Sequence, residues 1–216
     1  MSVGRLATNT ITGARASGFQ KLALDTGALI EGLYEKLENV TDFETLMNII
    51  EAEIISENGL GMTRGGNEFV TDAEQRQIEF DGSRLRFVGD FVKDTVHPRI
   101  STSLIEFSEE NIRRIIPSSI TEVNGFRTSI TERIRVDAGD YMKSLSWVRN
   151  RSDGSIQIIT LFNALNTESV TIPGDDKNEA AMAVSFAAFV DDFQERGVAP
   201  YVIEFFHPEQ GYNPED

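Results

Sequence analysis

From residue 67 to its end, the chain is largely a series of short extended segments separated by turn signals. In several segments apolar and polar residues alternate, which is typical of a strand with one buried face. Glycine-containing turns such as Asp81-Gly82 and Asp153-Gly154 lie between neighbouring segments, so we expect antiparallel hairpins there. The predicted strands are 77–81, 84–88, 91–106, 126–136, 141–149, 155–162 and 201–206.

Two helices interrupt this pattern. In residues 41–57 the apolar side chains form one stripe, and Thr41 and Glu44 have the spacing of a capping box. The second helix begins after Ser108, a candidate N-cap, and is expected to end at Pro117. The stripe of the first helix consists of Phe43, Leu46, Met47, Ile50 and Ile54.

Residues 178–192 are ambiguous on pattern alone. Their alanine content favours a helix, whereas the spacing of Met182, Val184 and Phe186 favours a strand. Taken together, the segments predict a mainly β protein, a β-sandwich or rolled barrel with a flanking α-helix and an additional helix near 41–57.

Charge limits the partners that this protein can have. Among its 216 residues, 35 are acidic and 20 are basic, which gives a net charge of −15. Binding to a nucleic-acid backbone or an anionic membrane surface requires a basic patch, so the balance argues against both. The chain has no cysteine, which excludes disulfides, thiolate metal ligands and a cysteine nucleophile.

One domain is expected after a short arm. Residues 1–20 are rich in Thr, Ala, Gly and Ser and show no lasting period, which alone favours a frayed terminus. Residues 21–216 show no composition break or repeat and are expected to form a single domain. We find no apolar core of a secretory signal and no membrane-length apolar run, and we expect a soluble protein made in a cytoplasm.

The residues give little basis for catalysis. Both histidines, His97 and His207, precede a proline, and no metalloprotease or nucleophile-elbow motif surrounds them. The glycines of 59–66 lack the spacing of a dinucleotide or phosphate loop and indicate a structural turn. We therefore predict no catalytic residue, no cofactor site and no metal site.

Five ordered motifs resemble the tail tube (major tail) proteins of long-tailed bacteriophages. They are Leu24–Ala28, Gly61–Gly66, Glu74–Gly82, Phe107–Ile112 and a C-terminal motif of Phe186–Asp191 followed by Ala199–Ile203, and together they span about residues 24–206. Their order carries the resemblance, because each motif alone is unspecific. The helix predicted at 41–57 is a departure, since the family often has only a loop there.

The resemblance implies a structural virion protein without enzymatic activity. Six subunits would form a ring whose inner strands close into a barrel, and stacked rings would conduct DNA into the host without binding it. Residues 179–191 would then be a strand, and the arm would contact a neighbouring subunit. The implied partners are other copies and the tape measure, terminator and distal tail proteins, with assembly in the host cytoplasm and final location in the phage tail.

Basic residues are candidates for contacts between acidic subunits, although a solvated face explains them equally well. The candidates are Arg5, Arg15, Lys21, Arg64, Arg127 and Arg133. Several alternatives stay open: a tail terminator or connector, the tube of a contractile injection system, a monomeric β-sandwich binding module that uses Trp147 and Tyr141, and a hydrolase that uses His97 or His207.

Overall fold

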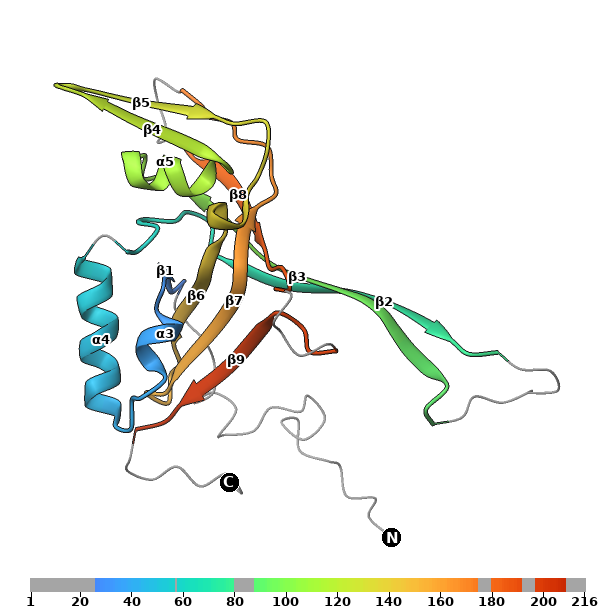
Figure 1. Cartoon of the computed structure of the whole chain (residues 1–216). Helices are drawn as coiled ribbons and strands as arrows, with labels where there is room; N and C mark the ends of the chain where they lie inside the picture. The colour runs from blue at the N-terminus through green and yellow to red at the C-terminus, as the bar shows by residue number, and fades with distance from the viewer. Residues whose placement is uncertain (1–25, 57, 80–87, 175–179, 192–196, 209–216) are drawn as a thin grey trace, which may run out of the picture.

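The computed structural model describes residues 26–56, 58–79, 88–174, 180–191 and 197–208, and it shows a mainly β fold with flanking helices (Figure 1). None of the helices in these ranges is long and apolar enough to cross a membrane. The elements are β1 (Ala28–Glu31), α3 (Tyr34–Leu37), α4 (Phe43–Ile55), β2 (Glu68–Gln77), β3 (Phe91–Leu104), α5 (Glu109–Ile115), β4 (Ser119–Asn124), β5 (Arg127–Glu132), the 3₁₀ turn η1 (Ala138–Asp140), β6 (Met142–Asn150), β7 (Ile156–Asn166), β8 (Met182–Ala187) and β9 (Tyr201–Phe206).

Seven strands form one antiparallel sheet in the order β1-β6-β7-β8-β3-β2, with β9 also paired to β7. The long strand β7 changes its partner along its length. Residues 156–161 pair with β9, whereas Leu165 and Asn166 pair with β8. Strands β4 and β5 form a separate hairpin, which lies beyond α5 in Figure 1.

The segment 58–64 links the edge strand β1 to β3, the strand next to the opposite edge of this sheet. On one side the amide of Leu60 donates to Leu29 of β1 at 2.8 Å, and on the other the amide of Arg64 donates to Ser103 of β3 at 2.8 Å. Between them the chain turns at Gly61, whose φ of +74° suits glycine. The sheet is therefore curled into a roll that this segment closes, which corresponds to the predicted rolled barrel.

Side chains pack on both faces of the curled sheet. Inside the roll, Leu29, Ile100, Leu161 and Phe186 belong to one buried cluster, to which β1, β3, β7 and β8 all contribute. On the outer face, α3 and α4 cover a second cluster, which includes Leu33, Leu46, Ile50 and Ile158. Because β7 is buried on both faces, its sequence is a nearly continuous apolar run instead of an alternating one.

Helix α4 confirms the predicted helix but corrects its cap. The side chain of Asp42, not Thr41, accepts a hydrogen bond from the amide of Thr45 at 2.7 Å. The pKa of Asp42 is lowered, first by a hydrogen bond from the side chain of Thr45 and then by this bond from its amide. The apolar stripe is also shorter than predicted, because Leu46 and Ile50 are buried while Ile54 is half-exposed.

Replacing Asp42 with Ala should remove the only observed side-chain cap of α4. We expect the free energy of unfolding to fall by about 1 kcal/mol, the usual cost of a lost N-cap. Thr41→Ala is the matched control and should change the stability by less than about 0.5 kcal/mol. Urea unfolding of both variants measures this, and an equal loss in the two would contradict the assignment of the cap.

Several predicted strands keep their place with different bounds. Strand β2 lies at 68–77 and shares only Gln77 with the predicted strand 77–81. The turn expected at Asp81-Gly82 and residues 84–87 of the strand predicted at 84–88 lie outside the described residues. Strand β5 covers only 127–132 of the predicted 126–136, since Arg133 turns away to bond Ser118 and two aspartates. The ambiguous 178–192 segment contains strand β8, because its pairing with β3 buries Met182, Val184 and Phe186.

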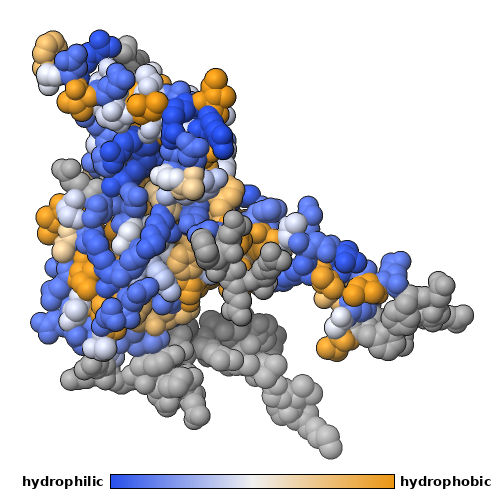
Figure 2. Space-filling model, in the orientation of Figure 1, coloured by the Kyte–Doolittle hydropathy of each residue, from blue (hydrophilic) through white to orange (hydrophobic). Residues whose placement is uncertain are grey.

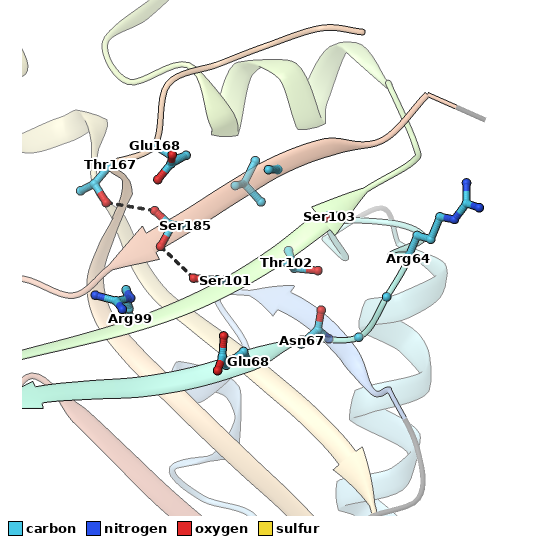
Figure 3. A pocket seen from close by; sticks show the side chains of 14 residues that line it. Arg64, Asn67, Glu68, Arg99, Ser101, Thr102, Ser103, Thr167, Glu168 and Ser185 are labelled. Carbon is cyan, nitrogen blue, oxygen red and sulfur yellow. Dashed lines mark hydrogen bonds between the residues drawn. The ribbon is translucent and has the colours of Figure 1, made fainter. Parts of the chain in front are cut away.

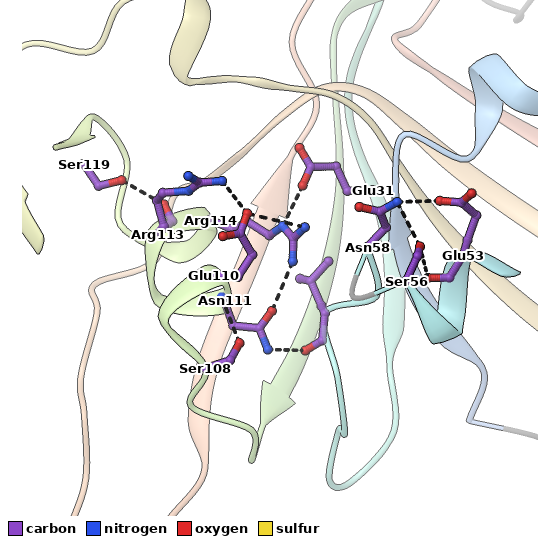
Figure 4. A network of polar contacts seen from close by, with 11 residues as sticks. Glu31, Glu53, Ser56, Asn58, Ser108, Glu110, Asn111, Arg113, Arg114 and Ser119 are labelled. Atoms are coloured by element: carbon purple, nitrogen blue, oxygen red, sulfur yellow. Dashed lines mark hydrogen bonds and ion pairs between the residues drawn. The ribbon is translucent and has the colours of Figure 1, made fainter. Parts of the chain in front are cut away.

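Two polar contacts fasten the helices to the closing segment and to β1 (Figure 4). The guanidinium of Arg114 on α5 is almost fully buried and donates to Glu31 of β1 at 2.6 Å. The carboxylate of Glu53 on α4 accepts from Lys36 at 2.5 Å and from Asn58 at 2.6 Å. Burial acts to raise the pKa of Glu53, but these two donors outweigh it and lower the pKa overall.

The contacts of Glu53 should make the fold sensitive to acid. Because its folded-state pKa lies below the unfolded value, ionised Glu53 stabilises the fold above the unfolded pKa, and this contribution is lost as pH falls through the folded pKa. Glu53→Gln should therefore lower the free energy of unfolding at pH 7. On acidification, this variant should lose less of its free energy of unfolding than the wild type does. Denaturant unfolding from pH 7 to pH 3 measures this, with the exposed Glu51→Gln as control. Parallel stability curves for wild type and Glu53→Gln would rule the contribution out.

Candidate functional site

The hairpin of β4 and β5 projects from the body and exposes apolar side chains. It turns through Gly125 and Phe126, and Gly125 has a φ of +63°, as two-residue hairpin turns require. The register places Val123 opposite Thr128 and Thr121 opposite Ile130, so these β-branched residues share one face. Val123 is largely exposed, and Phe126 at the tip is fully exposed.

A second projection is the arm formed by the outer parts of β2 and β3. Strand β8 accompanies β3 only along Arg99–Leu104, so beyond Pro98 the two strands of the arm pair only with each other. A β-bulge at Asp94 interrupts their register, and Arg76 holds that residue at 2.9 Å. Such bulges bend and twist a hairpin. Apolar side chains remain exposed near the end of the arm, namely Ile78, Val88 and Phe91.

Both projections carry apolar surface that the body of the protein does not cover. Figure 2 shows apolar side chains on the hairpin and on the arm, on opposite sides of the polar body. In a monomer, the fully exposed Phe126 at the tip of the hairpin does not contribute to packing of the fold. The arrangement is suited to docking against another protein surface.

An open groove of about 820 Å³ lies where β8, β3 and the turn before β2 meet (Figure 3). Its floor carries hydroxyl groups, and the hydroxyls of Ser101 and Ser185 are 3.0 Å apart. Its charged groups have both signs, since Arg64 and Arg99 line it together with Glu68 and Glu168. Arg99 also forms an ion pair with Asp72. A groove lined by hydroxyl groups and by charges of both signs indicates no particular class of ligand.

The structure describes three of the six basic residues that the sequence suggested. Arg5, Arg15 and Lys21 lie outside the described residues. Arg64 is exposed at the rim of the groove, and Arg127 is exposed at the start of β5, next to the tip of the hairpin.

Arg133 is instead held within its own chain. It bonds Asp137 at 2.6 Å and Asp140 at 2.5 Å, and it also bonds the carbonyl of Ser118. Its guanidinium therefore organises the connection from β5 to η1. Of the three candidates in the described ranges, only Arg127 lies on one of the apolar projections.

The residues of the alternative hypotheses do not gather into a site. Trp147 is buried and donates its indole N–H to the carbonyl of Thr26 at 2.9 Å. Tyr141 packs edge-on against Phe189 instead of lining an aromatic groove. His97 lies on the arm, whereas His207 follows β9. Across the described ranges, no group of three His, Asp or Glu side chains is arranged to hold a metal ion.

The sequence analysis missed both apolar projections as a site. Val123 and Phe126 fit the alternation of an ordinary half-buried strand, and only the structure shows that nothing in the described chain covers them. The one available signal was a phenylalanine directly after Asn124-Gly125, a position where turns seldom place a large apolar residue. No protein-family model matches the chain, and the search of curated proteins found no match either.

Proposed function

We propose that this protein is a non-enzymatic structural subunit that assembles with copies of itself into stacked rings, as the tube of a phage tail. The observation that carries the proposal is the pair of apolar projections on opposite sides of the body. A ring that also stacks needs contacts around it and along its axis, and such contacts use different surfaces of one subunit. Two separate projections meet that need.

The motifs that carry the resemblance support the proposal, because three of them occupy positions that determine the fold. Gly27 lies against Trp147, with no room for a side chain. Gly61 forms the corner of the segment that closes the roll, and Ser108 caps α5 through the amide of Asn111 at 3.1 Å. A resemblance at such positions supports a proposal about the architecture of the chain.

The acidity of the chain fits a conduit for DNA. Six copies at −15 each would give a ring about −90 in charge, which repels a phosphate backbone and opposes its adhesion to the wall. On this proposal the protein is located in the virion, and its partners are other copies together with the terminator, tape measure and distal tail proteins.

Negative-stain electron microscopy of the purified full chain, concentrated at near-physiological salt, tests the proposal. We expect rings with a central hole or tubes of stacked rings. Sedimentation velocity over a concentration series provides the matching solution measurement. Uniform monomers at every concentration would contradict self-assembly and favour the monomeric binding module.

A further inference from the structure

Two arginines, of which Arg151 also pairs with Asp153 at 3.6 Å, and an exposed aromatic ring form a small surface at the end of the roll opposite α5. Strand pairing places Arg149, Gln157 and Phe205 side by side on neighbouring strands, so their side chains share one face of the sheet. The guanidinium of Arg151 lies 5.3 Å from the centre of the Phe205 ring. We call these four residues, with Ile203, the β9 patch.

Arg149 is the unusual member of the β9 patch. Its guanidinium lies 4.6 Å from the centre of the Trp147 ring and donates to the neutral amide of Gln157 at 2.8 Å. In the part of the chain that the structure describes, no carboxylate pairs with it. Partial burial, followed by repulsion from Arg151, lowers its pKa. A half-buried cation in so acidic a protein is a favourable place for an incoming carboxylate.

Exposed apolar side chains border the same cations. Phe205 and Ile203 are each almost half exposed on the edge strand β9. A segment that fits the β9 patch therefore carries carboxylates and at least one aromatic or apolar residue.

We propose that residues 209–216 of the same chain dock on the β9 patch, with their carboxylates on Arg149 and an aromatic contact to Phe205. This segment, EQGYNPED, contains Glu209, Glu215 and Asp216 with Tyr212 between them. It follows β9 directly, and Phe206 pairs with Ile156 beside the cations. Two strand spacings separate Phe205 from Arg149, about 10 Å, whereas eight residues reach about 26 Å. The docking is intramolecular and does not rest on the proposed function.

Energy transfer within the full-length protein tests this docking. Trp147 is the only tryptophan, and the chain has no cysteine, so Gly211→Cys carries a single dansyl acceptor. Labelled protein is diluted into excess unlabelled protein so that transfer within one chain is measured. Arg149→Gln should lower the ratio of docked to free segment about tenfold, because one charge-assisted hydrogen bond is lost. Arg113→Gln, remote on α5, is the control and should leave the transfer unchanged.

A second variant leaves the folded body intact. Replacing Glu209 and Glu215 with Gln and Asp216 with Asn should lower the transfer as much as Arg149→Gln does. Equal transfer in the wild type and in either variant would overturn the docking. A fall with Arg113→Gln as large as that with Arg149→Gln would also overturn it, since general charge attraction would then explain the proximity.

Discussion

Replacing Gly27 with Ala is expected to destabilise the fold by about 2–5 kcal/mol. Gly27 has a φ of +72°, and a β-carbon there would lie 2.3 Å from the carbonyl oxygen of Val148 and 2.6 Å from the indole nitrogen of Trp147. The left-handed backbone costs an alanine about 1–2 kcal/mol, and overpacking adds about 1–3 kcal/mol. The obstructing carbonyl belongs to the backbone of β6, so a side-chain rotation cannot relieve the contact.

Gly65 provides a matched control for this substitution. Its φ of +82° is similar, but a β-carbon there would meet nothing within 4 Å. Gly65→Ala therefore measures the cost of the backbone conformation alone, about 1–2 kcal/mol. Urea unfolding followed by the fluorescence of Trp147 compares the two variants. If Gly27→Ala loses no more stability than Gly65→Ala, the close approach to β6 carries no energetic weight.

The second large effect is expected on assembly. Phe126→Asp should abolish the rings and tubes that we propose and leave the folded subunit intact, because Phe126 is fully exposed at the tip of the β4–β5 hairpin. An aromatic anchor at an interface contributes about 2–4 kcal/mol, so each contact should weaken at least about 30-fold. Sedimentation velocity measures the assembly, and urea unfolding should show a change within about 0.5 kcal/mol.

Thr131→Asp is the control for this prediction. Thr131 is exposed and pairs with Ile120, on the face of the hairpin opposite Val123 and Thr128. It receives the same charge on the same hairpin, on the face opposite Val123 and away from the tip. If Thr131→Asp and Phe126→Asp impair assembly equally, added charge is the cause and the tip is not a specific contact. If Phe126→Asp assembles normally, the hairpin is not part of the interface.

Local signals predicted most elements of the fold, and tertiary context decided the rest. Ser108 was identifiable as a cap because no other cap-forming residue adjoins it, whereas Thr41 and Asp42 are both suitable and only the backbone selects Asp42. Ile54 belongs to the apolar stripe, yet Glu53 takes the buried place beside it, since Lys36 and Asn58 satisfy its carboxylate. Neither donor can be inferred from the sequence of the helix.

The candidate site was less predictable than the fold. An alternating pattern shows which residues share a face of a strand, but it does not show whether anything covers that face. Val123 is exposed because β4 and β5 pair only with each other, and this depends on where α5 directs the chain. The short helix α3 and the closing role of 58–64 were missed for the same reason, since both depend on contacts between distant segments.

The closing segment 58–64 also bears on the order in which the protein can fold. It makes isolated bridges to β1 and β3 instead of belonging to a strand, so it cannot link these two strands before they are in place. They are positioned by β6, β7 and β8, and β6 begins only at Met142, whereas the closing segment ends at residue 64. The roll is therefore a late product of folding, and a growing chain keeps its interior open to water until its C-terminal half has been made.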